Sequence, residues 1–486
     1  HRDLHSFPTR RSSDLRITID ATGAAYPLTV DPLLHTQVVQ LHASTPVPGA
    51  EFGYSVAVSA DVLVVGAPHA DVGTTNNIGA AYVFHRDQSA PGAWGEVQIL
   101  RADDGQAEDR FGWSVAISGD VIVVGALDAD GGAGDPRGDA GAAYVFQRVL
   151  GRTDDWEQQV ILRASDAAAY DRFGRSVAIS GDVIVVGAAD KNSSAGVAYV
   201  FERGLSWGQV KILQAPGATV EDIYGVSVAV DGDVIVVGAS CVDSAAANAG
   251  AAYVFQRNQG GANNWGQAAI LYASDARAND RLGGSVAISG DVIVAGATGV
   301  NVMTDPGAAY VFQRYQGGAN HWGQVRKLTA SDARGGDSFG GSVAVSGDVI
   351  VVGAANNDGA ANNAGAVYVF QRDLDGGNRW GQAQALHAAD AQASDGLGLA
   401  VAISGDVIVA GAPAEAGSGA TYVFQRTEND PWQQTTLAHS SEAQAYDNFG
   451  DSAAISGDVL VVGAYSEDYG PGDAIPGAGA AYSNNR

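Results

Sequence analysis

One stretch of sequence returns eight times along the chain and constrains every possible fold. Its cleanest copy occupies residues 111–148 and reads FGWSVAISGDVIVVGA, then a loop rich in Asp and Gly, then GAAYVFQR. Neighbouring copies lie 51 to 62 residues apart, as the steps 173–224 and 111–173 show. The position that opens each copy is occupied by Phe52, Phe111, Phe173, Tyr224, Leu282, Phe339, Leu397 and Phe449. Self-similarity at a nearly fixed period indicates a repeat protein.

Each copy has the pattern of four short strands. In the second copy, Ser114–Ser118 alternates small polar residues with Val and Ile, which is typical of a strand with two unlike faces. Gly119 and Asp120 form a two-residue turn, for which Gly at the first central position favours type II′. Val121–Val124 is a continuous β-branched run, typical of a strand covered on both faces. Two further strands follow, and no helical period occurs, so we expect an all-β repeat.

The two ends of the repeat array decide between a ring and an open solenoid. Residues 37–43 align with residues 209–215, a fourth strand, so the array opens with a fourth strand that lacks the first three. The last copy has its first two strands and the start of the third, Ala480–Tyr482, but no fourth. We therefore expect the first strand to complete the last blade, closing a β-propeller of four-stranded antiparallel blades. Eight copies predict eight blades, with seven blades and one stray repeat as the alternative.

The repeated motif resembles the FG-GAP repeat, the unit of the β-propeller head of integrin α-subunits. Phe111-Gly112 matches the FG of that name and Gly125-Ala126 matches the GA, and the resemblance covers roughly residues 36–483. It implies a propeller that binds ligands on the face formed by its longer loops. Several integrin repeats also carry a calcium loop between the first two strands. Here that loop has shrunk to a Gly-Asp turn, which cannot supply six to eight oxygen ligands, so those calcium sites are not expected.

Composition narrows the possible partners. The 486 residues carry a formal net charge of -27 and a single cysteine, Cys241. This charge argues against binding to nucleic acid or anionic membranes, and it favours cations or basic surfaces as partners. No apolar run approaches the ~20 residues of a membrane-spanning helix, so membrane insertion is not expected.

The segments outside the array have a different character. Residues 1–15, HRDLHSFPTRRSSDL, are basic and rich in Ser, and we interpret them as a non-native segment derived from a sequencing adapter. Residues 16–35 have the pattern of an extended arm, which suggests a module of a larger chain. The final SNNR is expected to break the third strand of a truncated last copy. We therefore expect a monomeric module of an extracellular or cell-surface protein whose signal peptide has been lost.

Aromatic residues suggest two different roles. A Trp stands near the start of the fourth strand in seven copies, at Trp94, Trp156, Trp207, Trp265, Trp322, Trp380 and Trp432. A sugar-binding platform would use exposed rings, but a residue repeated at a fixed offset in every unit is typical of the core between repeats. We therefore expect a wedge between blades. Trp113 lies outside this series, directly after Phe-Gly, and is a candidate for the ligand-binding face.

Carboxylates provide the other candidate sites. Seven aspartates precede the Phe-Gly position by two residues: Asp109, Asp171, Asp222, Asp280, Asp337, Asp395 and Asp447. In a closed ring they would surround the axis on the loop face, either as a site for cations or basic ligands or as acceptors of backbone N–H groups in their own turns. A weaker candidate for calcium is the acidic loop that contains Asp128, Asp130, Asp135 and Asp139.

No catalytic constellation is evident in the sequence. It contains no Gly-x-Ser-x-Gly elbow and no phosphate-binding loop, and Cys241 has no evident base partner. We therefore expect a non-catalytic binding or adhesion module that presents acidic loops to a protein or glycan, with calcium as a possible cofactor. Two alternatives are an accessory domain of a larger secreted enzyme and a structural component of a surface layer.

Overall fold

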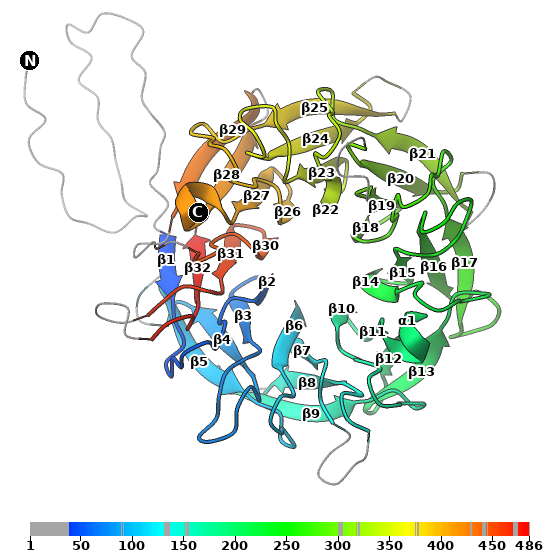
Figure 1. Cartoon of the computed structure of the whole chain (residues 1–486). Coiled ribbons are helices and arrows are strands. Elements are labelled where there is room, and N and C mark those ends of the chain that lie inside the picture. The colour runs from blue at the N-terminus through cyan, green and yellow to red at the C-terminus, as the bar shows by residue number, and fades with distance from the viewer. Residues whose placement is uncertain are drawn as a thin grey trace, which may run out of the picture. The chain divides into compact units, whose positions relative to one another are not determined.

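The computed structural model describes residues 38–485, apart from gaps at 89, 91, 131–136, 150, 152–154, 300–304, 317, 319–320, 375, 377–378, 428–429, 440–443, 445 and 470–474. The predictions for residues 1–15 and 16–35 therefore lie outside the described residues. Residues 36–486 form one compact unit. It consists of eight four-stranded antiparallel sheets arranged as the blades of a closed ring (Figure 1). The predicted eight-bladed propeller is confirmed, and the seven-bladed alternative is wrong.

The first two strands of each blade lie nearest the axis. Blades are numbered 1 to 8 in the order of their Phe-Gly positions. The innermost strands are β2 (Ser55–Ser59), β6 (Phe111–Ser118), β10 (Ser176–Ser180), β14 (Tyr224–Asp231), β18 (Val286–Ser289), β22 (Phe339–Ser346), β26 (Val401–Ser404) and β30 (Ala453–Ser456). The second strands are β3 (Val62–Ala67), β7 (Val121–Ala126), β11 (Val183–Ala188), β15 (Val234–Ala239), β19 (Val292–Ala297), β23 (Val349–Ala354), β27 (Val407–Ala412) and β31 (Val459–Ala464).

The outer half of each blade contains the third and fourth strands. The third strands are β4 (Ala80–Arg86), β8 (Ala142–Arg148), β12 (Val197–Arg203), β16 (Ala251–Arg257), β20 (Ala308–Arg314), β24 (Ala366–Arg372), β28 (Ala420–Thr427) and β32 (Ala480–Asn485). The outermost are β5 (Trp94–Leu100), β9 (Trp156–Leu162), β13 (Trp207–Leu213), β17 (Trp265–Leu271), β21 (Trp322–Leu328), β25 (Trp380–Leu386), β29 (Asp430–Ala438) and β1 (Val38–Leu41). Two helical turns, α1 (Lys191–Ser194) and η1 (Glu415–Gly417), lie in loops between second and third strands.

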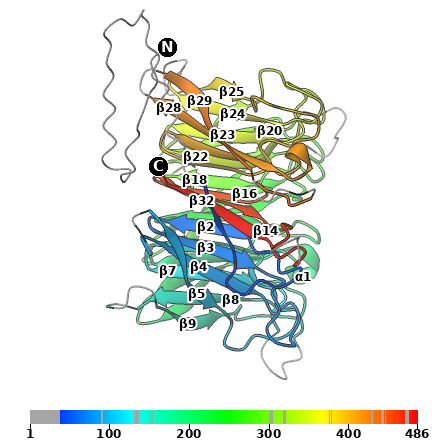
Figure 2. The ribbon, with the colours of Figure 1, turned by 90° about the vertical axis from the view of Figure 1, so that its left-hand side faces the viewer.

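The ring closes as the sequence predicts. Strand β1 pairs antiparallel with β32, with Val38 opposite Asn484 and Gln40 opposite Tyr482. Blade 8 therefore takes its outermost strand from the beginning of the array and the other three from its end, as the blue β1 beside the red β32 shows (Figure 1). The red β32 of this last blade lies next to the blue strands of blade 1 (Figure 2). This pairing covers the edge of β32 that would otherwise be open to association.

One prediction about the last blade is wrong. Strand β32 does not break after Tyr482 but continues through Ser483 to Asn485, because Ser483 still pairs with Val39 on one side and Val461 on the other. Backbone pairing on both edges holds the strand even though its side chains depart from the repeat. Ser483 is completely buried where the other seven blades have Val, and its hydroxyl has no hydrogen-bond partner among the described residues.

The aromatic and β-branched positions of the motif build the core between blades. Second strands such as β7 are buried along their whole length, as their continuous apolar run predicts. Phe111 packs edge-on against Tyr144 and Phe146, with ring centroids 5.2 and 6.0 Å apart. Trp156 shares this cluster with Val62 and Val64 of blade 1. The seven tryptophans of the fourth-strand series are 1% to 8% exposed, so the predicted wedge between blades is confirmed.

The glycines of the motif allow neighbouring blades to join through their backbones. Gly79 forms a parallel bridge with Phe111 of the next blade, and equivalent bridges occur at all eight junctions. Gly79 has a φ of +83°, and an added Cβ would lie 2.1 Å from the carbonyl oxygen of Phe111, so only Gly fits. In six blades a serine of the first strand also donates to the carbonyl of the next Phe-Gly glycine, as Ser55 does to Gly112 at 2.8 Å.

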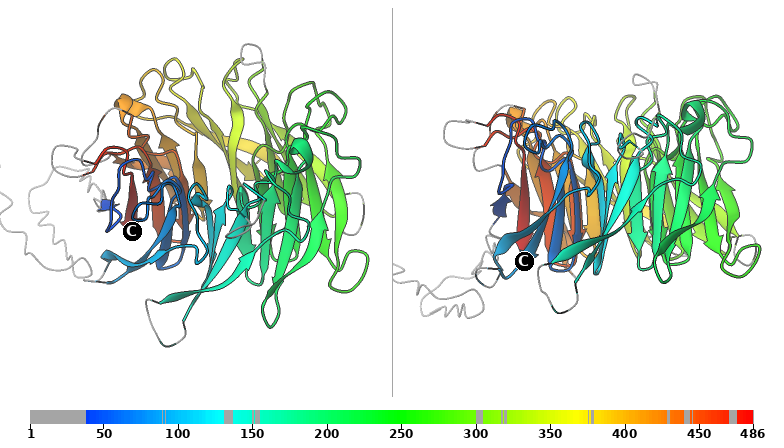
Figure 3. Two further views of the ribbon diagram at one scale, coloured as in Figure 1. Left: turned by 60° about the horizontal axis from the view of Figure 1, so that its bottom comes forward. Right: turned by 90° about the horizontal axis from the view of Figure 1, so that it is seen from below.

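The loops divide between the two ends of the ring. The Gly-Asp turns lie at one end, where Gly119 N–H donates to Ser59 Oγ of the previous blade at 3.3 Å and equivalent bonds link the other junctions. The opposite end, here called the loop face, carries the longer loops, including those with α1 and η1 (Figure 3). Within the described part of the chain, no helix has the length and apolarity needed to cross a membrane.

Candidate functional site

The seven predicted aspartates all lie on the loop face, one in each of blades 2 to 8. Each accepts a hydrogen bond from the backbone N–H three residues earlier, at 2.5 to 2.8 Å. Their side chains are only 1% to 8% exposed. These aspartates therefore fix the loop that connects one blade to the next, the second of the two predicted roles. The structure keeps them in separate loops and does not join them into a common ligand shell.

Individual members of this series gain further partners. Lys191 Nζ donates to Asp171 Oδ2 at 2.6 Å, the Asn357 amide donates to Asp337 Oδ2 at 3.1 Å, and the Thr219 hydroxyl donates to Asp222 Oδ1 at 2.8 Å. Burial raises the pKa of Asp109 to about 6, and it also raises the pKa values of Asp280, Asp337 and Asp395. The side-chain partners and pKa values differ because the residues around each aspartate vary, whereas the hydrogen bond from the backbone N–H is present at all seven.

The position after Phe-Gly breaks the symmetry of the ring. In blades 8, 1, 2 and 3 it is occupied in turn by Asp451, Tyr54, Trp113 and Arg175. In blades 4 to 7 the same position is occupied by Val226, Gly284, Gly341 and Leu399. These residues lie just before the innermost strands or within their first three residues, so they surround the axis at the loop face (Figure 1). One side of this opening therefore carries large aromatic and charged side chains, and the other does not.

Trp113 belongs to a small aromatic cluster. Its ring centroid lies 4.7 Å from that of Tyr54, which in turn lies 5.9 Å from Tyr465 of blade 8. All three side chains are partly exposed. Burial, followed by the charges of Glu51 and Asp451, raises the pKa of Tyr54 to about 12. We call Tyr54, Trp113, Tyr465, Arg175 and Asp451 the axial patch.

Ion pairs extend from the axial patch along blades 2 and 3. Asp128 contacts Arg110 Nη1 at 2.8 Å and Arg172 Nε at 3.2 Å. Arg172 and Arg175 each contact Asp190 at 3.3 Å. Asp128 is 6% exposed, and these guanidinium groups compensate its buried charge.

The acidic loop proposed for calcium is only partly described. Asp130 Oδ1 accepts the backbone N–H of Asp139 at 3.1 Å, which closes the loop on itself, while Asp135 lies outside the described residues. The two arginine contacts of Asp128 count against a cation there, since they occupy the same carboxylate. Calcium binding at this loop stays a prediction.

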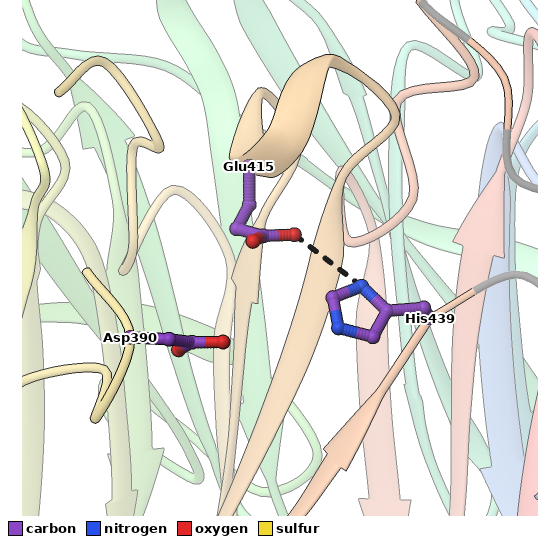
Figure 4. A group of neighbouring side chains, drawn as sticks. All are labelled: Asp390, Glu415 and His439. Carbon is purple, nitrogen blue, oxygen red and sulfur yellow. Dashed lines mark ion pairs between the residues drawn. The ribbon is translucent and has the colours of Figure 1, made fainter. Parts of the chain in front are cut away.

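A third cluster was not predicted from the sequence. Asp390, Glu415 and His439 lie between blades 6 and 7, with one potential ligand atom from each within 4.8 Å of the others (Figure 4). Burial raises the pKa of Glu415, and Asp395 and Asp390 raise it further, while His439 lowers it. Comparing the copies position by position would have shown that Glu415 stands where blade 3 has Lys191. It would also have shown that aromatic and charged residues follow Phe-Gly only in blades 8, 1, 2 and 3.

Among the profiles of known protein families, one matches along the whole array. The profile of the FG-GAP repeat matches residues 35–84, 94–146, 156–201, 207–255, 265–312, 322–370, 380–424 and 432–482. The chain belongs to the FG-GAP repeat family. Each match to the FG-GAP profile begins in or just before a fourth strand and ends in the third strand of the following blade, so the family unit spans a junction between blades.

Other comparisons extend only to the fold of this FG-GAP propeller. No protein of curated function matches it significantly. Among solved structures it is similar to Sqt1 from Chaetomium thermophilum, with a TM-score of 0.55, 13% identity, and coverage of 92% of this chain and 100% of that one. It is also similar to Saccharomyces cerevisiae Sqt1, with a TM-score of 0.50, 9% identity, and coverage of 92% and 97%. At such low identity these similarities show the propeller fold alone.

Proposed function

We propose that this FG-GAP propeller is a non-catalytic binding module of an extracellular or cell-surface protein, and that it holds a protein or glycan ligand at the axial patch. The single observation that carries this proposal is the broken symmetry of the position after Phe-Gly. Core positions recur in every blade because every junction needs them. Aromatic and charged side chains restricted to blades 8, 1, 2 and 3 are not needed for that packing, and they favour a binding role.

The chemistry of the patch supports the same proposal. Tyr and Trp side chains contribute large contact areas and dominate many binding sites, and a partly exposed aromatic cluster can stack on a sugar ring or an aromatic side chain. Arg175 and Asp451 border the cluster with charges of opposite sign that can orient a polar ligand. The surrounding loops are variable on a rigid framework, which is the usual location of binding residues.

Two variants test this proposal against a defined set of ligands. The propeller is applied to an array of bacterial and host glycans and to an array of cell-surface proteins. For any ligand that binds, we expect W113A and Y54A to weaken binding at least tenfold, because each removes a stacking surface. The matched control is L399A, which truncates the 45% exposed Leu at the same position of blade 7 and should leave binding unchanged. A ligand that binds W113A and Y54A as tightly as it binds the native protein would contradict the proposed location of the binding site.

A further inference from the structure

One position between the blades carries residues of different charge in different copies. It is the third residue after the second strand, and in blades 3, 6 and 7 it is occupied by Lys191, Asn357 and Glu415. These three side chains are 0% to 3% exposed, so the position is buried. It faces two carboxylates in each case: the aspartate that precedes Phe-Gly in the same blade and an aspartate that follows the fourth strand of the previous blade.

In blade 3 a lysine compensates the charges of the two carboxylates. Lys191 Nζ donates to Asp171 Oδ2 at 2.6 Å and lies 3.6 Å from Asp166 Oδ2. Asp166 also accepts the hydroxyl of Tyr199 at 2.7 Å. The Lys191 ammonium group therefore compensates two carboxylates. A buried charge needs such a partner because burial removes its contact with water. In blade 6 the neutral Asn357 amide donates to Asp337 instead.

Blade 7 keeps both carboxylates but reverses the charge between them. Asp390 and Asp395 correspond to Asp166 and Asp171, and Asp390 likewise accepts a tyrosine hydroxyl, that of Tyr422 at 2.9 Å. Glu415 occupies the place of Lys191, so a third carboxylate stands where blade 3 has a cation. The charges of Asp390 and Asp395 both act on Glu415.

The side chain of Glu415 points toward Asp390 and His439, and one of its carboxylate oxygens makes no hydrogen bond among the described residues. Glu415 is 3% exposed, and its Oε2 atom has no hydrogen-bond partner among the described residues. The imidazole of His439 lies beside it, with Nδ1 3.3 Å from Oε2 (Figure 4). A buried carboxylate oxygen in this state costs free energy unless a cation compensates it.

We propose that a divalent transition-metal ion, for which Zn²⁺ is the probe, binds between blades 6 and 7 with Asp390, Glu415 and His439 as its ligands. The ion takes the place that the Lys191 ammonium holds in blade 3. One imidazole nitrogen and two carboxylate oxygens form a ligand set typical of Zn²⁺, with water completing four-coordination. Ca²⁺ is disfavoured because it needs six to eight oxygen ligands. Asp390 and His439 are exposed, so the ion can reach the site from solvent.

Equilibrium dialysis of the full chain with Zn²⁺ after chelator treatment tests this site. We expect the native protein to bind one more equivalent of Zn²⁺ than E415K, in which the lysine reproduces the arrangement of blade 3. Other histidines are common to both proteins, so the difference reports on this site alone. Equal stoichiometry for the native protein and E415K would overturn the proposal.

A second pair of variants keeps the test valid if E415K does not fold. H439A removes the nitrogen ligand from an exposed position, and we expect it to weaken Zn²⁺ binding at this site at least tenfold. The matched control is H387A, since His387 occupies the same place in blade 6, where Asn357 replaces the glutamate. H387A should bind like the native protein.

The unfolding temperature distinguishes the type of ion. Zn²⁺ should raise it for the native protein and H387A but not for H439A, because an ion that binds only the native state stabilises that state. An increase with Ca²⁺ and none with Zn²⁺ would overturn the assignment to a transition metal. An equal increase with Zn²⁺ in H439A and the native protein would exclude His439 as a ligand.

Discussion

Single residues that depart from the repeat show what each position of the motif contributes. The Gly-Asp turn between the first two strands requires a positive φ at its first residue, and Gly119 adopts +57° there. In blade 1 this residue is Ala60, which has a φ of +52°. An alanine in this conformation is strained because its Cβ approaches the backbone carbonyl.

Replacing Ala60 by glycine should therefore stabilise the propeller. We expect A60G to increase the free energy of unfolding by up to about 1 kcal/mol. The substitution relieves the strain of the turn, and the greater entropy of glycine in the unfolded chain offsets part of that gain. Urea unfolding followed by tryptophan fluorescence measures this change. The reverse substitution in blade 2, G119A, should destabilise by a similar amount. Equal stability of A60G and the native protein would show that the strain at Ala60 is no larger than the entropy cost of glycine in the unfolded chain.

The burial of Asp109 links stability to pH. Its pKa is about 6 in the native state, against 3.8 for an ordinary Asp, because burial disfavours the charged form. The native state therefore binds more protons than the unfolded state around pH 6, so stability increases as pH falls through this value.

The variant D109N should remove this contribution. Between pH 7.5 and pH 5.5, the native protein should gain about 1 kcal/mol of unfolding free energy relative to D109N, whose amide does not titrate. Chemical denaturation of both proteins at the two pH values gives the difference. If their stabilities change in parallel, the carboxyl of Asp109 does not titrate in this range.

At the scale of the secondary-structure elements, strand β32 shows that backbone pairing can hold a strand whose side chains do not fit the repeat. The Ser483 hydroxyl is buried without a hydrogen bond among the described residues, where every other blade has valine. Pairing with β1 and β31 on its two edges holds β32 in place nevertheless.

We expect S483V to stabilise the protein by about 1 to 2 kcal/mol, because it removes an unsatisfied polar group and fills the site with an apolar side chain. The midpoint of urea unfolding measures the effect. The matched substitution V423S, at the same position of blade 7, should destabilise the protein by at least as much. A lower midpoint for S483V would mean that the hydroxyl has a favourable partner.

At the scale of the whole molecule, stability depends on closing the ring. Strand β1 is short, yet Leu41 is only 4% exposed and belongs to a core cluster that also contains Val459 and Val461 of blade 8. Without β1, the edge of β32 would expose unpaired backbone groups and favour association with other chains.

A truncated protein that begins at Ala43 tests this dependence. We expect it to lose at least about 2 kcal/mol of unfolding free energy, the contribution of burying one leucine side chain, and to associate with itself in sedimentation velocity experiments. A protein that begins at Thr36 keeps β1 and serves as the control. Equal stability and a monomeric state for both proteins would show that β1 does not contribute to closure.

The sequence by itself determined the architecture of this protein, because each element repeats eight times and each local pattern is unambiguous. The four strands of each blade, the eight blades, the tryptophan wedge and the closure through residues 38–41 all follow from periodicity and from matching the two ends of the array. Membership of the FG-GAP family rests on the same repeated residues.

Only the tertiary structure decided which side chains meet between blades. The seven aspartates are spaced identically in sequence, yet only the folded ring shows that each is buried against its own loop. Tyr54, Trp113 and Tyr465 come from three blades, and Asp390, Glu415 and His439 come from two, so their contacts depend on how adjacent blades pack. The charge reversal from Lys191 to Glu415 has meaning only because folding places each of them beside an equivalent pair of carboxylates in its own blade junction.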